Sequence, residues 1–512
     1  MLGEILDQHD YEGLIRQLES ESEHAPAAFR SKVFAISVFA YFGLAILLAA
    51  SACLIYIGWQ WASARHSVRM MIYAGLFALT MLPVFWVSLR FFFMRMEPPS
   101  GREITRAEAP KLFEVLDKMR KKRKGPPIHH VLIDREYNAA ISQMPRWGLF
   151  GGHTNYLMLG LPYLFGVPPK EMLATVAHEY GHLCGDHGKM GAWVYRQRLT
   201  FGMLYRQVSE SGENNWSHAG LTALLGAFMP YYNAYTFVLS RQQEYEADRT
   251  ATELVGAEAN ATGLIRDALQ GRWIAEDFWP KFYKLADGHP QPPFLPFASM
   301  RTAFGLSYAE WATPARLSAA WREDSNWHDT HPCLRLRVEA TGRSASLPPA
   351  ISLTAAEVLL GGTAKRLTEE FDQAWWKDEK KNWTSRHQYV QRSRQELAEL
   401  AARPLDSLPL HELQQLALLQ AEFNSRDVAK PILEYLLAKP GGPYAKPSFF
   451  YGRMLLDEKN DRGLAHLETA ANNDRNLVGS VARIGYQYLY NHRGEQAAIE
   501  WWQKIVPAED DE

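Results

Sequence analysis

The sequence predicts a mainly α-helical protein in three parts: a membrane-spanning pair of helices, an α+β central domain with a small β-sheet, and a C-terminal array of helical repeats. Three observations predict this fold class. Two long apolar segments lie before residue 95, two histidines four residues apart lie near residue 180, and a spacing of about 34 residues recurs in the tail. A chain of 512 residues is long enough for two to four structural units.

The composition argues against two classes of protein. A formal net charge of −2 gives no electrostatic signature of nucleic-acid binding, and we expect no nucleic-acid partner. The three cysteines, Cys53, Cys184 and Cys333, are too widely spread to form a disulfide framework. We therefore expect a reducing setting rather than a secreted scaffold held by disulfides.

Two apolar segments predict membrane-spanning helices. Residues 33–64 contain no Asp, Glu, Lys or Arg, and residues 70–89 read MMIYAGLFALTMLPVFWVSL. About 20 apolar residues span the hydrocarbon core of a bilayer. A buried core helix and a signal peptide are the alternatives, but the first segment follows a polar tail, residues 1–32, with no cleavage pattern behind it. We predict two transmembrane helices, in contact with lipid, within residues 33–95.

The flanking charges predict an orientation for this hairpin. The loop between the two spans carries only two arginines, whereas several basic residues follow the second span, including the run RKKRK at residues 120–124. Positive charge marks the cytoplasmic side of a membrane protein. We therefore expect the N-terminal tail and the domains after the hairpin in the cytosol, with the inverted topology as the alternative.

The stretch GVPPKEMLATVAHEYGHLCG predicts one helix that carries a metal-binding motif. Prolines suit its first turn, and Gly185 is a plausible stop. His178 and His182 are four residues apart, so both imidazoles project from one face and can bind a single zinc ion. Glu179 stands beside the first histidine, where a general base for a zinc-activated water is placed in H-E-x-x-H motifs. Two surface histidines are the alternative reading.

A third ligand would distinguish these readings, and three candidates exist. His187 fails the longer H-E-x-x-H-x-x-G-x-x-H pattern, which needs its last histidine at the position of Gly188. Asp186 is close in sequence, but a helix that continues past His182 turns it away. The third candidate lies downstream, in LSRQQEYEAD.

In that downstream segment, Glu244 and Asp248 are again four residues apart on a predicted helix. Glu244 could supply an oxygen ligand, and Asp248 could accept a hydrogen bond from a ligating imidazole. Glu246 is the rival ligand, but a step of two residues turns about 200° around a helix, so Glu244 and Glu246 cannot both face one metal. A charged helix face without any metal is the alternative.

The two motifs together resemble the membrane zinc metallopeptidases that include the bacterial HtpX heat-shock proteases and the CAAX prenyl proteases. The resemblance covers roughly residues 105–340. These enzymes are gluzincins, and the resemblance implies a metallopeptidase domain in which His178, His182 and Glu244 bind Zn²⁺. It also implies that Asp248 supports a ligating histidine and that Glu179 is the catalytic base.

Two weaker matches extend the resemblance. YNAA contains Asn138, which the resemblance places next to a strand that pairs with the substrate backbone, expected here at residues 155–160. DTHPCLRLR resembles a family segment whose histidine and arginine fall on His331 and Arg337. The resemblance assigns these two residues to contacts with the substrate or its oxyanion.

The number of membrane crossings is a point of departure from the family. Residues 214–240 carry no Asp, Glu, Lys or Arg and are long enough to span. Because His178, His182 and Glu244 must meet on one side of the membrane, an even number of spans must separate them. The only partner segment, residues 191–212, carries four charges, which are costly in lipid. We therefore read residues 214–240 as a buried or membrane-resting helix.

The tail predicts helical repeats. Asn424, Asp457 and Asn491 recur at steps of 33 and 34 residues within similar helix–turn–helix patterns. A period near 34 is typical of tetratricopeptide-like arrays, whose units bury their apolar faces against one another. Such an array could hold a protein partner, or it could be a cap that only stabilises the enzyme.

Together these features predict five regions: a cytosolic tail (1–32), two transmembrane helices (33–95), a metallopeptidase domain (96–345), a helical linker (346–404) and the repeats (405–512). The expected function is zinc-dependent hydrolysis of peptide bonds in protein substrates, in quality control or processing at a bacterial inner or cell membrane. The alternative is a membrane-tethered adaptor or chaperone with a non-catalytic zinc site. Processing of prenylated proteins is a third reading that rests on family analogy alone.

Overall fold

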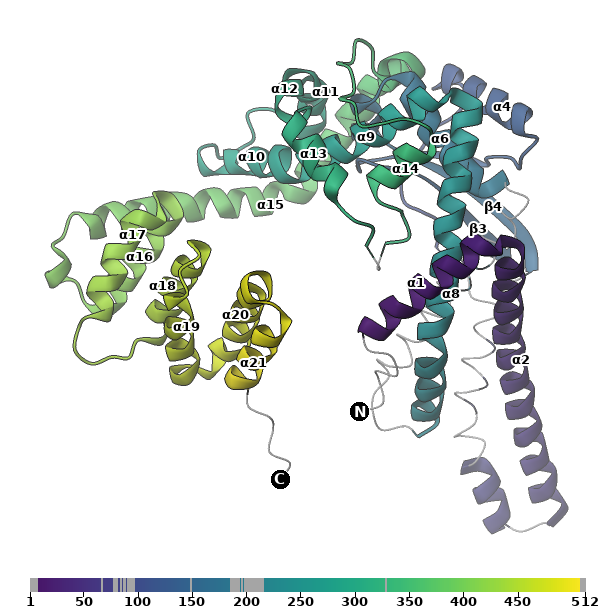
Figure 1. Ribbon diagram of the computed structural model, residues 1–512, viewed down its shortest axis with the longest axis horizontal. Coiled ribbons are helices and arrows are strands. Elements are labelled where there is room, and N and C mark those ends of the chain that lie inside the picture. Colours follow the sequence, from purple (N-terminus) through teal and green to yellow (C-terminus); the bar gives the residue numbers. More distant parts are fainter. Residues whose placement is uncertain are drawn as a thin grey trace. The chain divides into compact units, whose positions relative to one another are not determined.

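A computed structural model describes residues 8–65, 68–76, 97–147, 150–184, 216–326 and 329–506, together with five isolated residues (82, 85, 89, 194 and 197), as Figure 1 shows. The chain divides into two compact units. The first unit contains Met1–Phe282 and Phe294–Asp378, and the second contains Tyr283–Pro293 and Glu379–Glu512. The five sequence regions given above stay a prediction.

The first unit begins with two helices, α1 (Gln8–His24) and α2 (Pro26–Arg65). Within the described residues, one helix is long and apolar enough to cross a membrane, and it is Pro26–Trp61 of α2. Its large apolar side chains are mostly exposed, for example Phe39 and Ile46. The second predicted span, residues 70–89, lies largely outside the described residues.

A four-stranded mixed sheet lies behind the candidate site. Its strands are β1 (Arg102–Glu103), β2 (His130–Asp134), β3 (Ala139–Trp147) and β4 (Phe150–Gly160), in the order β1-β2-β4-β3. β3 and β4 form an antiparallel hairpin with Ile141 opposite Leu157, and β2 runs parallel to β4. β3 is therefore an edge strand, and β4 is paired on both sides.

This topology corrects one prediction. Residues 155–160 were expected to form the strand that pairs with a substrate, but they belong to β4, whose two edges are already bonded to β2 and β3. The exposed edge belongs to β3 instead. Neither strand of the hairpin shows a regular alternation of apolar and polar residues, and so the sequence alone did not distinguish the inner strand from the outer one.

Five helices surround this sheet and the site. They are α4 (Pro110–Arg123), α5 (Leu161–Gly166), α6 (Pro169–Cys184), α8 (Trp216–Val255) and α9 (Ala257–Trp273). α6 begins at Pro169, as its prolines predict, and it buries the apolar face that includes Met172, Val176 and Tyr180. α8 is one continuous helix of 40 residues, so the apolar segment 214–240 and the residues Glu244 and Asp248 share it from residue 216 on.

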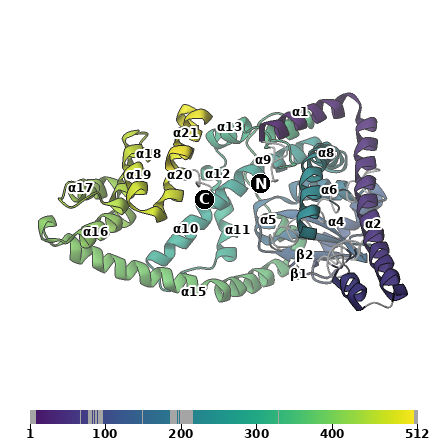
Figure 2. The ribbon, with the colours of Figure 1, turned by 90° about the horizontal axis from the view of Figure 1, so that it is seen from below.

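The part of α8 just before Glu244 is buried against α1 and α2. Residues of α1, α2 and α8 form one apolar cluster with Val194: Ile15, Leu18, Phe29, Val33, Ala234, Phe237, Val238 and Leu239. Figure 1 and Figure 2 show α1 next to α8, and the two helices are in contact. The reading of this segment as a buried helix therefore holds for the residues of this cluster.

The elements that follow α9, up to the end of α15, are all helical. They are η1 (Ile274–Phe278), α10 (Trp279–Lys284), η2 (Leu285–Asp287), α11 (Pro296–Leu306), α12 (Tyr308–Trp311), α13 (Pro314–Arg322), α14 (Leu334–Ala340), η3 (Ala356–Leu360) and the long helix α15 (Gly362–Ala401). α10 and α15 run from one unit into the other, and η2 belongs to the second unit.

The second unit contains three helix pairs, preceded by η4 (Leu405–Ser407). The pairs are α16 (Leu410–Phe423) with α17 (Arg426–Leu437), α18 (Ala445–Asp457) with α19 (Arg462–Asn473), and α20 (Val478–Arg493) with α21 (Glu495–Ile505), the last preceded by η5 (Arg475–Leu477). Asn424, Asp457 and Asn491 lie at or near the end of the first helix of each pair. The helix–turn–helix pattern is observed, while its assignment to tetratricopeptide-like repeats stays a prediction.

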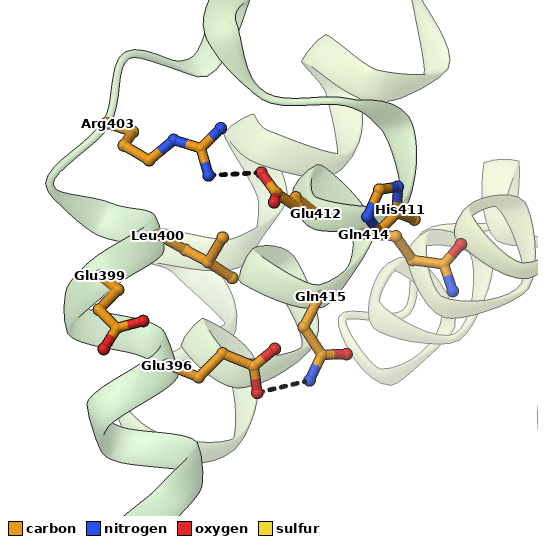
Figure 3. Close-up of a pocket in the computed structure, with 8 residues that line it drawn as sticks. All are labelled: Glu396, Glu399, Leu400, Arg403, His411, Glu412, Gln414 and Gln415. Carbon is orange, nitrogen blue, oxygen red and sulfur yellow. Dashed lines mark hydrogen bonds and ion pairs between the residues drawn. The ribbon is translucent and has the colours of Figure 1, made fainter.

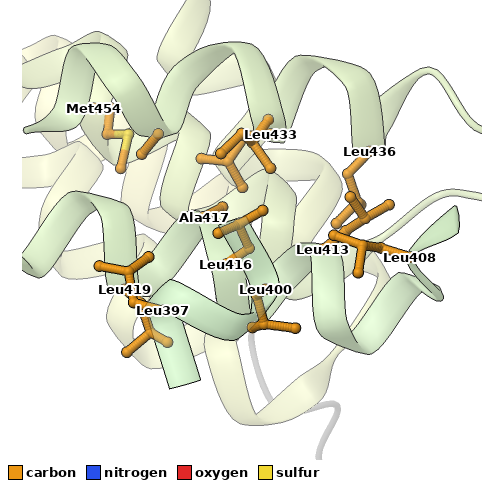
Figure 4. Packing of buried hydrophobic residues seen from close by; sticks show 12 residues of the cluster. Leu397, Leu400, Leu408, Leu413, Leu416, Ala417, Leu419, Leu433, Leu436 and Met454 are labelled. Atoms are coloured by element: carbon orange, nitrogen blue, oxygen red, sulfur yellow. The ribbon is translucent and has the colours of Figure 1, made fainter. Parts of the chain in front are cut away.

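Leucines hold the first helix pair to the end of α15. Figure 4 shows Leu397 and Leu400 of α15 packed against the apolar faces of α16 and α17, which include Leu416 and Leu433. Each fully buried leucine stabilises such a core by roughly 2 kcal/mol through the area removed from water. The C-terminal end of α15 therefore shares one apolar core with the first pair.

A groove of about 730 Å³ lies between α15 and α16 (Figure 3). Its walls carry charged and amide side chains, and two cross-links join them: Arg403 Nη1 pairs with Glu412 Oε2 at 2.6 Å, and Gln415 Nε2 donates to Glu396 Oε2 at 3.3 Å. The lining of the groove is therefore mainly polar. The predicted partner role of these repeats stays a prediction.

Asp267 on α9 yields a prediction about stability and pH. Burial, and then the charge of Glu171, raise the pKa of Asp267 to about 7, against 3.8 for an ordinary aspartate. The folded state therefore holds this proton more tightly than the unfolded state, and stability falls as pH rises from about 4 to about 7. We expect Asp267→Asn to raise the melting temperature at pH 8 but to change it little at pH 4.

The measurement for Asp267→Asn is thermal unfolding of the variant and the parent chain across this pH range. Asparagine keeps an oxygen that can accept the hydrogen bond of Tyr137, whose hydroxyl lies 3.4 Å from the Asp267 carboxylate. The gain at pH 8 should be roughly 1 to 4 kcal/mol, since each pKa unit corresponds to about 1.4 kcal/mol. An unchanged pH profile would show that Asp267 is ionised normally.

Candidate metal centre

α6 and α8 approach each other closely at Gly181. A Cβ atom on Gly181 would lie 3.0 Å from the Cα atom of Ala247 and 3.1 Å from Cβ of Thr250. Only a residue without a side chain lets the two backbones come so near without displacing each other. Because Gly181 directly precedes His182, and Ala247 lies between Glu244 and Asp248, this contact brings the two sequence motifs together.

Three side chains converge at this crossing. His178 Nε2 lies 3.3 Å from His182 Nε2 and 3.4 Å from Glu244 Oε2, and His182 Nε2 lies 3.4 Å from Glu244 Oε1. Ligands about 2.0–2.1 Å from one tetrahedral zinc ion are about 3.3–3.4 Å apart, and so these separations fit a single metal. Among the described residues, these three form the one group able to hold a metal ion.

The surroundings of the two imidazoles favour metal binding. His178 Nδ1 lies 2.8 Å from Asp248 Oδ1, so Nδ1–H is donated to this carboxylate and Nε2 faces the cluster. Burial lowers the pKa of His182 to about 4, which keeps its imidazole neutral. Burial also acts to lower the pKa of His178, but the hydrogen bond with Asp248 and the interaction with the Glu244 carboxylate raise it to about 9, so a metal must displace a proton there.

Arg337 completes the support of His178. Its Nε and Nη2 atoms donate to the two oxygens of Asp248 at 2.9 and 2.8 Å, which is a bidentate pair. Burial alone would raise the pKa of Asp248, but the hydrogen bonds from Arg337 and His178 outweigh burial and hold that pKa well below its usual range. Asp248 is therefore an anion that fixes the orientation of the His178 ring.

Glu244 has the properties of a metal ligand. Its side chain is only 7% exposed, and its Oε2 atom accepts no hydrogen bond within the part of the chain that the structure describes. Burial acts to raise its pKa, but the neighbouring histidines outweigh burial and lower that pKa to about 2. A buried and ionised oxygen without a hydrogen-bond donor is costly unless a cation neutralises it.

Glu179 lies beside the cluster, between α6 and β3. One of its oxygens, Oε2, accepts a hydrogen bond of 3.1 Å from the backbone N–H of Ile141. Burial raises the pKa of Glu179, while His178 and the Ile141 bond act to lower it. The edge strand therefore fixes the position of this carboxylate, and its environment makes it a stronger base than an exposed glutamate.

The other predicted residues occupy three different places. His331 is half-exposed, with Nε2 3.6 Å from Glu244 Oε2 and Nδ1 2.8 Å from Asp329 Oδ1, so it lies beside the cluster. Asn138 is exposed at the start of β3, where its Oδ1 accepts from the N–H of Ala139 at 2.8 Å. The rejected candidates Asp186 and His187 lie outside the described residues.

The rival ligand Glu246 does not join the cluster. It forms an ion pair with Arg30 of α2, on another side of α8. The helical-wheel argument that excluded it therefore agrees with the geometry.

Sequence reasoning missed Gly181, Ile141 and Asp329. Close backbone approach and backbone hydrogen bonds leave little signal in a single sequence. The glycine inside HEYGH was the one visible hint.

Two helices that bring two imidazoles and a carboxylate to one point, with a further glutamate alongside, have the architecture of a metallopeptidase centre. Residues 159–344 match the model of peptidase family M48. The match confirms the resemblance on which the ligand assignment depends, and it supports a hydrolase. A search of the curated proteins found no match, and a search of the solved structures found none.

Gly181 yields a prediction about metal affinity. We expect Gly181→Ala to push α6 away from α8 by a few tenths of an ångström, because its Cβ meets backbone rather than a flexible side-chain end. The His182–Glu244 distance should lengthen, and zinc affinity should fall roughly tenfold. Alanine also gains about 1 kcal/mol of helix propensity, so folding should change much less than metal binding.

The measurement is zinc competition with a chromophoric chelator, together with thermal unfolding. Gly271→Ala is the matched control, because a Cβ atom on this helical glycine would meet the ring of Tyr137 at an ordinary 3.8 Å. Equal zinc affinity for the parent chain and Gly181→Ala would contradict the role assigned to this crossing.

Proposed function

We propose that this protein is a membrane-anchored, zinc-dependent endopeptidase that hydrolyses peptide bonds of protein substrates. One observation carries this proposal. His178, His182 and Glu244 converge at one point, and Glu179 lies beside them without being one of the three ligands. A purely structural metal site does not need Glu179. The family match over residues 159–344 supports a peptidase and does not favour the adaptor.

The residues divide the chemistry among them. Bound zinc would polarise the scissile carbonyl and acidify a water molecule. Glu179 takes the proton of the attacking water and later passes it to the leaving amine, and burial raises its pKa, which makes its carboxylate a stronger base for the first transfer. Its hydrogen bond to Ile141 holds Oε2, which leaves Oε1 for the proton.

His331 and Arg337 have different roles in this proposal. Arg337 donates two hydrogen bonds to Asp248 and so holds the Asp248–His178 pair, with its charge near the reacting centre. His331 is half-exposed beside Glu244, where its imidazole can donate to the oxyanion of the substrate. Asp329 orients that imidazole through Nδ1.

The substrate would lie extended along β3. Because the N–H of Ile141 points at Glu179, the backbone groups of Gln143 point the same way, away from β4. Pro145 has no N–H to offer at the next such position, which limits pairing at that end. Asn138 would contact the substrate at the start of the strand. Binding through the backbone gives loose sequence specificity.

The membrane anchor would be α2, with its exposed apolar surface in lipid and the metal centre in the cytosol. This placement suits quality control or processing of membrane-associated proteins. The supporting observations are the length and apolarity of Pro26–Trp61 and the exposure of its large side chains.

The first prediction of this proposal concerns catalysis. We expect Glu179→Gln to keep one bound zinc and to lose casein cleavage by at least about a hundredfold, since the amide cannot accept the water proton. Zinc content and cleavage are measured on detergent-purified parent and variant. Glu246→Gln, a glutamate two residues from a ligand but paired with Arg30, is the matched control and should cleave. Cleavage by Glu179→Gln would remove this residue from the mechanism.

The second prediction concerns the anchor. We expect the chain to stay in the membrane pellet after extraction at alkaline pH, and Phe42→Asp with Ile46→Asp to release it. These two exposed side chains lie one turn apart on α2, and two carboxylates in lipid are costly. Phe42→Leu with Ile46→Leu is the control. Release of the parent chain by the same extraction would contradict an integral membrane protein.

A further inference from the structure

Arg241 lies on the metal-binding face of α8. It precedes Glu244 by three residues and Asp248 by seven, and both steps return to the same side of a helix. Asp248 and Arg241 are about 20° apart around the axis. The structure thus places a buried cation one turn before the carboxylate ligand, with only 8% of its surface exposed.

The guanidinium of Arg241 joins two other parts of the chain. Nη1 donates to Oε1 of Glu19 on α1 at 2.5 Å, and Nη2 donates to the backbone oxygen of Asn326 at 2.7 Å. The group also lies over the ring of Phe237, with its central carbon 4.6 Å from the centroid. A planar fork with fixed donors is suited to holding two acceptors at once.

Asn326 lies close in sequence to His331, which stands beside the metal ligands. It lies three residues before the His331 segment, residues 329–333, whose far end is fixed because the N–H of Cys333 donates to Ser325 Oγ at 2.9 Å. Beyond this segment, Arg337 on α14 binds Asp248. The His331 segment is therefore attached to α8 on both sides of Glu244.

The other partner, Glu19, belongs to a helix that is firmly docked. Ile15 and Leu18 of α1 are buried in the apolar cluster with α8, and the backbone oxygen of Ser22 accepts from Gln242 Nε2 at 3.1 Å. A second ion pair, Arg30 with Glu246, joins the start of α2 to α8 without touching the His331 segment. Two separate ion pairs thus fasten the N-terminal helices to α8.

We propose that Arg241 is a positioning residue, which couples the N-terminal helix α1 to the His331 segment and so holds His331 over the metal centre. The proposal rests on the proposed peptidase function. It makes residues 8–24, which sequence reasoning treated as a cytosolic tail, part of the catalytic unit. Glu19 fixes the guanidinium, and the guanidinium fixes Asn326.

The kinetic test compares Arg241→Met with Arg30→Met, which removes the other ion pair between the N-terminal helices and α8. We expect Arg241→Met to keep its zinc, to lower kcat about tenfold and to change KM by less than about twofold. Arg241→Lys should restore part of kcat, and Arg30→Met should retain it. Equal losses in both methionine variants, or full activity in Arg241→Met, would overturn the proposal.

A double-mutant cycle shows whether Arg241 acts through His331. If it does, Arg241→Met should cost little further activity in a His331→Ala background, because the two effects are not additive. Additive losses would mean that Arg241 works through something else, and the proposal would fall.

Hydrogen–deuterium exchange tests whether Arg241 positions the His331 segment without any measurement of activity. In the full-length protein, Arg241→Met should speed exchange of residues 329–333 and of α1, whereas Arg30→Met should leave residues 329–333 unchanged. If the parent chain binds zinc but cleaves nothing, the proposed function fails, and the exchange result still decides whether Arg241 positions the segment. Unchanged exchange of residues 329–333 in Arg241→Met would overturn it.

Discussion

The close crossing of α6 and α8 is the constraint on which the rest of the site depends. Each helix supplies a pair of residues by local geometry alone, His178 with His182 and Glu244 with Asp248, because side chains four residues apart share a face. Neither pair is a metal site by itself. The contact at Gly181 turns two helical faces into one donor set, with separations of 3.3 to 3.4 Å.

This crossing has an electrostatic cost, and the neighbouring residues offset it. The carboxylates of Glu244 and Asp248 are withdrawn from water, and Glu179 stands close to them. Arg337 neutralises Asp248 through two hydrogen bonds, but no second guanidinium is bonded to Glu244 or Glu179 among the described residues. The remaining negative charge explains why the site suits a divalent cation, while burial is the main reason that the pKa of Glu179 is raised.

Local periodicity predicted the parts of the site that lie within single helices. The prolines predicted the start of α6. The facing histidines and the choice of Glu244 over Glu246 follow from a repeat of 3.6 residues. The mistaken edge strand has a different origin, because strand order depends on pairing between β2 and β4 that no local pattern contains. The bond from Arg241 to Asn326 joins residues 85 positions apart, and one sequence without homologues does not reveal such a contact.

α8 also explains why the N-terminal helices matter to the metal. Pro230 interrupts one backbone hydrogen bond within this long helix and makes that point the easiest to bend. The apolar contacts from α1 and α2 begin at Ala234, on the side of Pro230 that carries the ligand. About 14 residues, or roughly 21 Å of helix, separate Pro230 from Glu244. Motion of the apolar end of α8 can therefore be absorbed at Pro230, while the clamped part keeps Glu244 in register with the histidines.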